Sequence, residues 1–242
     1  MQKSAKYALI ACLVVVLGGG FAFYWFALRD TAPPEASLRT REDTTTTVPD
    51  EAAGSVTTAA APDSADGEWV VLADDPEAVF VGYRVLELFG GETVKKEAAG
   101  RTPIVEGTMV VDGAEVTDVD ITADLTGLES DSSRRDGMVQ GTVLQTSEFP
   151  EATFVLTEPV DLGGEPSLDA PVTTTATGEL TVHGVTKEVT FELEARWNGD
   201  TIDVAGSTPV VFADFGITAP ETPAVSVDTE GTIELQLTFI RP

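Results

Sequence analysis

The stretch GELTVHGVTKEVTFELEARW, residues 178–197, decides the fold because it holds two strand-like runs and the turn between them. From residue 188 onward, charged or polar residues alternate with the apolar Val189, Phe191, Leu193, Ala195 and Trp197. A period of two is the pattern of a strand that buries one face. His183 and Gly184 separate this run from the one that ends at residue 182. The stretch therefore predicts an antiparallel hairpin.

The same period recurs from residue 67 to the C-terminus. It is clear in 118–125 and 232–239, and weaker in 68–72, 79–86, 104–111, 153–160, 174–182 and 201–212. Gly or Pro separates most of these runs, and Asp112-Gly113 is a short hairpin signal. In the exception, 130–147, Ser132 and Ser133 are candidate caps of a short helix. We expect an all-β, antiparallel, lipocalin-like barrel of about eight strands with one short helix. A two-sheet sandwich is the alternative, but closure leaves no exposed strand edges.

The composition divides the chain into three parts: 1–29, 30–66 and 67–242. Residues 7–28 carry no charge and are long enough to cross ~30 Å of hydrocarbon as a helix. Because Lys3 and Lys6 precede them, we expect a transmembrane anchor with a cytoplasmic N-terminal tip. A cleaved signal peptide is the main alternative, and a lipoprotein cleavage box at 9–12 is disfavoured because the long apolar run follows it. The Thr-, Ala- and Pro-rich part 30–66 is expected to be a disordered linker, and 67–242 the barrel domain.

Charge and rare residues exclude several classes of function. The net charge is −27, and 33 acidic residues against nine basic ones give residues 67–242 a net charge of −24. Such a field repels phosphate backbones and anionic surfaces, so nucleic acid is not an expected partner. The single Cys12 and single His183 exclude cysteine-based and histidine-rich metal sites. His183 belongs to a turn and no paired nucleophile motif accompanies it, so we expect no enzyme and no cofactor.

Several short motifs, in this order and spacing, resemble the YceI family, whose members are described as lipocalin-like, polyisoprenoid-binding proteins of the bacterial cell envelope. The resemblance spans most of 69–241 and is similar to a membrane-anchored, acidic, actinobacterial-like branch. The motifs are Val81-Gly82-Tyr83-Arg84-Val85, Gly100-Arg101-Thr102, Ser130-Asp131 through Arg135-Asp136, 149–154 (FPEATF), 178–187 and Asp214-Phe215-Gly216-Ile217. Three histidine positions of many relatives are replaced, by Glu77-Ala78, Val85-Leu86 and Gly137-Met138-Val139. Any head-group contact made by those histidines does not carry over.

The resemblance implies an elongated apolar ligand inside the barrel, and a barrel of this size can enclose one. The candidate lipid-binding residues are Phe80, Val119, Ile121, Phe154, Leu180, Phe191, Leu193, Trp197, Leu235, Leu237 and Phe239. Ordinary core packing is the alternative for each of them. Arg134 and Arg135 are head-group candidates, and the alternative for Arg135 is an ion pair with Asp131 or another carboxylate. Lys95, Lys96 and Arg101 are expected to lie in a loop.

Together these inferences predict an extracytoplasmic, membrane-tethered protein that holds an isoprenoid or other long-chain fatty lipid. A structural or adhesive envelope domain without a ligand is the alternative, and a hydrolase or isomerase is remote. The predicted location is the cell membrane, with a single pass and the barrel outside. A homodimer is left open.

Overall fold

The computed structural model describes residues 32–39, 64–73 and 75–242, and these three ranges belong to one compact unit. The apolar run 7–28 and Cys12 lie outside the described residues. Within the described ranges, no helix combines the length and the apolar character that a membrane crossing needs.

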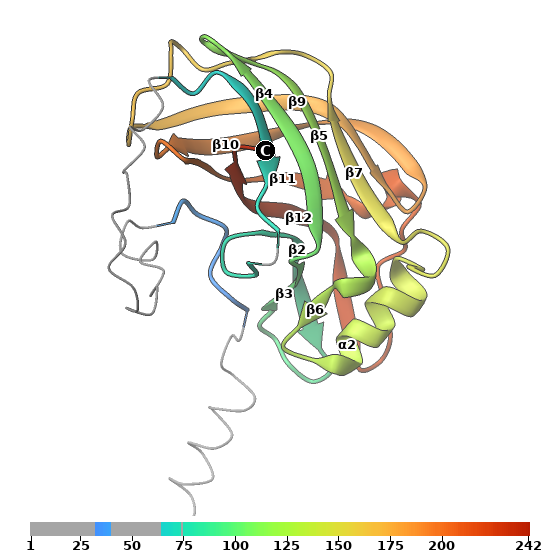
Figure 1. The fold of residues 1–242 in the computed structure, drawn as a ribbon. Coiled ribbons are helices and arrows are strands. Elements are labelled where there is room, and N and C mark those ends of the chain that lie inside the picture. Colours follow the sequence, from blue (N-terminus) through green and yellow to red (C-terminus); the bar gives the residue numbers. More distant parts are fainter. Residues whose placement is uncertain (1–31, 40–63, 74) are drawn as a thin grey trace, which may run out of the picture. The chain divides into compact units, whose positions relative to one another are not determined.

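Eight antiparallel strands form a closed circuit (Figure 1). Its order is β1 (Gly67–Val71), β4 (Val105–Asp112), β5 (Glu115–Asp124), β7 (Glu151–Leu156), β9 (Pro171–Val182), β10 (Val185–Trp197), β11 (Thr201–Val211) and β12 (Val225–Ile240). The circuit closes where β1 pairs with β12, Val70 opposite Ile240 and Val71 opposite Phe239. The expected barrel of about eight strands is confirmed, and the sandwich alternative is excluded by this closing pair.

Three further strands extend the sheet beyond β12: β2 (Phe80–Phe89), β3 (Lys96–Thr102) and β6 (Glu129–Ser130). A short strand, β8 (Val160–Asp161), pairs with β5. The expectation of a loop around residues 95–101 is wrong, because most of that stretch is β3. Its buried residues Ala98, Ala99 and Gly100 are small, so no alternation of large apolar residues marks it as a strand.

The predicted hairpin at 178–197 is present, with Val182 paired to Val185. His183 and Gly184 have φ values of 53° and 72°, the left-handed pair that a type I′ turn requires. The ring of Phe149 lies 4.7 Å from the His183 ring and packs where a side chain at position 184 would lie. His183 Nδ1 lies 3.3 Å from the carbonyl oxygen of Phe215. The motifs 149–154, 178–187 and 214–217 therefore meet at this turn. Their contacts support a structural role for His183.

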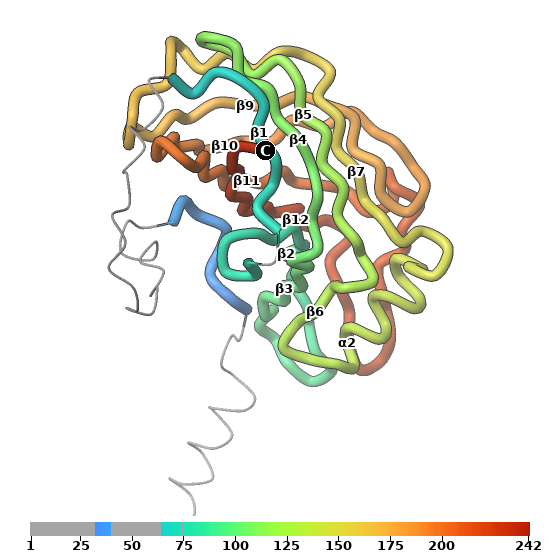
Figure 2. Tube along the Cα trace, viewed as in Figure 1, coloured from blue at the N-terminus to red at the C-terminus, as the bar shows by residue number. Residues whose placement is uncertain are grey.

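A short helical segment covers one end of the barrel, as 130–147 predicts. It consists of α2 (Ser133–Met138), capped by the Ser132 side chain, and the π-helical turn η3 (Val139–Val143). Figure 2 shows this segment at the end of the barrel where β3 and β6 lie. Two single-turn 3₁₀ helices, η2 (Leu125–Gly127) and η4 (Phe212–Phe215), complete the fold.

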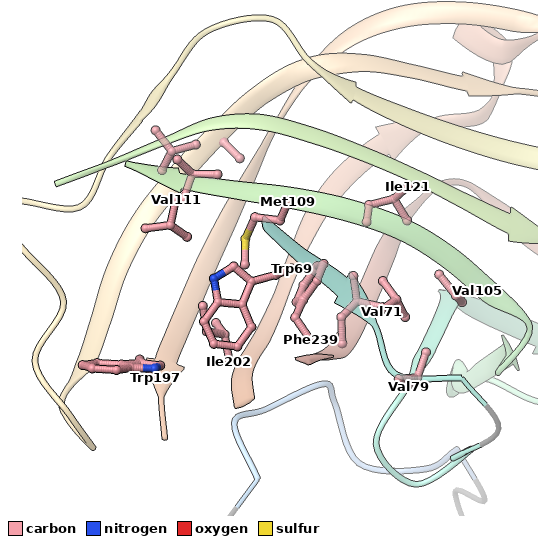
Figure 3. Close-up of a cluster of buried hydrophobic side chains, with 14 of the residues drawn as sticks. Trp69, Val71, Val79, Val105, Met109, Val111, Ile121, Trp197, Ile202 and Phe239 are labelled. Atoms are coloured by element: carbon pink, nitrogen blue, oxygen red, sulfur yellow. The ribbon is translucent and has the colours of Figure 1, made fainter. Parts of the chain in front are cut away.

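A cluster around Trp69 fills part of the barrel interior (Figure 3). The Trp69 side chain is fully buried, and its Nε1 donates to the carbonyl oxygen of Ala65 at 2.8 Å. Met109, Ile202 and Phe239 surround it in Figure 3. Large buried aromatic side chains of this kind supply much of the burial energy of a small domain.

Residues 32–39 have a defined position on the outer face of the barrel, although their composition predicts a disordered linker. Arg84 Nη2 donates to the carbonyl oxygen of Pro33 at 2.8 Å, and the backbone N–H of Ala36 donates to Glu234 at 3.3 Å. The segment has no regular secondary structure, so its backbone carbonyls are available to the arginine. We refer to residues 32–39 as the strap.

Beneath the strap lies a buried ion cluster on β2, β3 and β12. Glu234 is only 2% exposed and accepts from Arg84 at 3.2 Å and from Arg101 at 2.8 Å. Arg84 also pairs with Glu97 at 2.7 Å. The cluster joins neighbouring strands from outside, while the alternate residues of β2 face the barrel interior.

Candidate functional site: two connected apolar chambers

The barrel interior contains two cavities. The first, which we call the helix-side chamber, has a volume of about 150 Å³. Its walls come from β2, α2, η3, η4 and the ends of β9, β11 and β12. The second, the tryptophan-side chamber, has about 110 Å³ and ends at Met109 and Phe239, which belong to the Trp69 cluster. Since about 10–15 Å³ admits one water, both are large enough for part of an organic ligand.

The two chambers share four wall residues and therefore adjoin. Val81 and Ile233 come from the neighbouring strands β2 and β12, and Ala152 and Leu180 come from β7 and β9. We call these four shared residues the neck. Its small member, Ala152, pairs with another alanine, Ala123, on β5. Both chambers are lined mainly by apolar side chains, and the neck is part of the wall of each.

Nine of the eleven predicted lipid-binding residues line these chambers. Leu180 lies at the neck. The other eight line the tryptophan-side chamber: Val119, Ile121, Phe154, Phe191, Leu193, Leu235, Leu237 and Phe239. Phe154 and Phe191 pack edge to face with ring centres 5.4 Å apart. The period-two alternation therefore placed the inward faces of β5, β7, β10 and β12 correctly.

Phe80 and Trp197 line neither chamber, so both predictions of ligand contact are corrected. The Phe80 ring lies 3.9 Å from the guanidinium carbon of Arg101, on the outward face of β2. Trp197 is a core residue whose Nε1 donates to the carbonyl oxygen of Gly199 at 2.8 Å. Ordinary packing, the alternative reading, holds for these two.

Of the walls of the helix-side chamber, the sequence nominated only Leu180 and Arg135. Tyr83 and Val85 line it from β2, with further residues from segments that lack a period of two: Leu125, Leu128, Met138, Val139, Val143, Leu144, Phe212, Phe215 and Ile217. The motifs at 81–85 and 214–217 both contribute residues to this wall, so the sequence held part of the information needed to find it.

Tyr83, Glu87 and Arg135 are the polar residues of the helix-side chamber. Arg135 binds Glu87 through two parallel hydrogen bonds, Nε to Oε1 and Nη2 to Oε2, each 3.0 Å long. Its Nη1 donates to Asp131 and, at 3.2 Å, to Ser130. The hydrogen bonds to Glu87 raise the pKa of Arg135 above its usual range, so it stays charged. The ion-pair alternative thus describes Arg135.

Arg134, the other head-group candidate, is exposed and lines neither chamber. The adjacent motif residue Asp136 holds the loop before the helix instead of facing a ligand. Its Oδ1 accepts from the backbone N–H of Ser130 at 2.9 Å and from the Ser130 hydroxyl at 2.5 Å. The motif from Ser130 to Asp136 therefore fixes α2 against β2.

Tyr83 is held in place by a glycine. A side-chain carbon at position 100 would lie 2.6 Å from the Tyr83 ring, so only glycine fits beside it. Burial raises the pKa of the Tyr83 hydroxyl above its usual range, and Glu87, Asp136 and Asp131 raise it further against the opposing effect of Arg135. The phenol is therefore neutral. Within the described residues, burial and nearby charges act on this hydroxyl, and no side-chain hydrogen bond is among these effects.

The sequence of this chain matches a known protein family and several individual relatives. The family model of the YceI-like domain matches residues 72–239. A UPF0312 protein of Vibrio parahaemolyticus is 34% identical over 127 residues, which are 49% of this chain and 64% of the relative. One from Pseudomonas putida is 32% identical over 138 residues, 53% of this chain and 68% of the relative. The alignment thus spans just under two thirds of the Vibrio protein.

Two solved structures share the fold. BcnA of Burkholderia cenocepacia has a TM-score of 0.52 at 20% identity, covering 68% of this chain and 98% of its own. A polyisoprenoid-binding domain from Saccharophagus degradans has a TM-score of 0.54 at 17% identity, covering 72% of this chain and 98% of its own. At these identities the likeness concerns the fold alone. Because the family model covers more than half of the sequence, the chain belongs to the YceI family.

Proposed function

We propose that this protein is a binding protein that holds one long-chain lipid, an isoprenoid or a fatty chain, along the two chambers. The observation that carries the proposal is the pair of adjoining apolar chambers, which share the four residues of the neck. Each methylene moved from water into such a space contributes about 0.8 kcal/mol before ordering costs. The tail can therefore bind tightly without specific polar contacts. The Saccharophagus neighbour, described as polyisoprenoid-binding, supports the same class of ligand.

The proposal includes no catalytic step. His183, the chain's single histidine, lies at the turn with Phe149 and Phe215 and lines neither chamber. The alternative of a structural domain with a solid core is disfavoured, because packing around Trp69 fills only part of the interior.

We further propose that residues 7–28 anchor the barrel to the outer side of the cell membrane. The support is the length of the uncharged run and the two lysines that precede it. Protease treatment of intact cells and of opened cells tests this arrangement. Cleavage of the barrel in both would agree with it, and cleavage only in opened cells would contradict it.

Uptake of a fluorescent long-chain lipid from vesicles tests the binding function. Phe191, which is 3% exposed, lines the tryptophan-side chamber, so Phe191→Asp should abolish uptake. Val155→Asp is the matched control, because Val155 is 43% exposed and should leave uptake unchanged. Circular dichroism serves to check that both variants are folded. Normal uptake by a folded Phe191→Asp protein would refute the proposed site.

A further inference from the structure

The charges at the helix-side chamber indicate which kind of lipid head group it accepts. Arg135 is the single basic residue of its lining, and four of its five N–H groups are already engaged by Glu87, Asp131 and Ser130. A phosphate that enters would have to displace a carboxylate from this arginine. That exchange is unfavourable because the displaced carboxylate would remain in the same partly buried place.

The local charge also disfavours an anion. The four charged groups that act on Tyr83 are Arg135, Glu87, Asp131 and Asp136, and together they carry a net charge of −2. Glu87 is 7% exposed, and such charges are screened by solvent much less than surface charges are. The exposed Arg134 lies outside the chamber lining and does not reverse this balance at the ligand.

Tyr83 supplies the complementary feature. Tyr83 lines the chamber, and no side-chain hydrogen bond within the described residues engages its hydroxyl. Because the phenol is neutral, it can donate a hydrogen bond to an uncharged oxygen. Gly100 opposite the ring keeps this donor in one orientation.

From this geometry we propose that the helix-side chamber selects lipids with an uncharged, oxygen-bearing head group, bound by Tyr83, and rejects the same tail when it carries a phosphate. This inference rests on the proposed lipid-binding function and names its ligand class. The carboxylates around Arg135 provide the rejection, and the phenol provides the positive contact. The tail occupies the neck and the tryptophan-side chamber.

The test compares three probes with the same tail in direct binding to the full chain: geranylgeraniol, geranylgeranyl phosphate and the corresponding hydrocarbon. We expect the alcohol to bind at least about tenfold more tightly than the phosphate. Tyr83→Phe should weaken the binding of the alcohol by about 2- to 12-fold, the range for one neutral hydrogen bond, and leave the binding of the hydrocarbon unchanged. Thr181→Val is the control, because its hydroxyl bonds Thr186 away from the chambers and its removal should change no affinity.

A second pair of variants tests the carboxylates independently of Tyr83. Glu87→Gln and Asp131→Asn each remove one negative charge with little change of shape. Each should raise the phosphate affinity relative to that of the alcohol, and the double variant should do so most. Equal or tighter binding of the phosphate by the wild type would overturn the inference while the lipid-binding function stands. Failure of all three probes to bind would instead refute the proposed function.

Discussion

Blocking the neck should convert this protein from a long-chain to a short-chain binder. Ala152 lines both chambers and is 9% exposed, and its methyl group is the smallest side chain of the neck. Ala152→Phe places a ring in that passage. The helix-side chamber stays open, whereas the tryptophan-side chamber is closed to the tail.

The size of the effect follows from the length that is lost. Ile233 at the neck and Phe239 at the far end are six residues apart on β12, which is roughly 20 Å of strand. Even if only five methylenes of a tail lose this environment, the loss is about 4 kcal/mol. That corresponds to roughly a thousandfold weaker binding. A tail short enough to end at the neck should lose less than about tenfold.

Calorimetric titration with a series of alcohols of increasing chain length measures this cutoff. Val155→Phe is the matched control, because it adds the same ring to the same strand at an exposed position. For the wild type and the control, affinity should keep rising with tail length, whereas for Ala152→Phe it should level off. If the folded Ala152→Phe protein shows the wild-type dependence on length, the two chambers do not form one binding space.

Three further predictions concern the framework around the site. Glu234→Ala leaves buried Arg84 with Glu97 as its remaining carboxylate partner and should lower the free energy of unfolding by about 3–5 kcal/mol in urea titrations. Asp228→Ala, which breaks the exposed pair with Lys95, should cost at most about 1 kcal/mol. Equal losses in the two variants would show that the ion cluster beneath the strap is not buried in solution. Because the pKa of Tyr83 is raised, the folded chain keeps a proton that the unfolded chain releases near pH ~10. The free energy of unfolding should therefore fall above that pH by up to about 1.4 kcal/mol per pH unit. Tyr83→Phe should remove this contribution to the pH dependence. An unchanged alkaline slope in that variant would contradict the burial of the phenol. Gly100→Ala should destabilise the fold by about 1–3 kcal/mol through collision with the Tyr83 ring, while Gly137→Ala, with no atom within 4 Å, should be neutral or stabilising; a neutral Gly100→Ala in thermal unfolding would argue against this packing.

The sequence predicted the barrel well where one face of a strand is apolar and the other polar. On β10 and β12 the alternation is strict, and it placed Phe191 and Leu235 on the correct face. On β2 it failed, because Phe80 and Val81 are both apolar and either could start the inward set. A shift of one residue exchanges the two faces of a strand. An inward set that starts at Phe80 therefore assigns Tyr83 to the outward face.

Other features depend on contacts between distant segments. β3 consists of small and charged residues because Gly100 must accommodate Tyr83 on one side and Arg101 must reach Glu234 on the other. Neither contact requires apolar and polar residues to alternate along β3. The strap likewise has the composition of a disordered linker, and its position depends on Arg84, 51 residues beyond Pro33. Local patterns carry no information about such partners.

The most direct test of the central claim is the lipid content of the purified full chain, measured by native mass spectrometry with solvent extraction. We predict one long-chain, uncharged lipid per chain, lost in the Phe191→Asp variant and retained in the Val155→Asp control. A wild-type protein that is folded, carries no lipid and takes none up from vesicles would contradict the account.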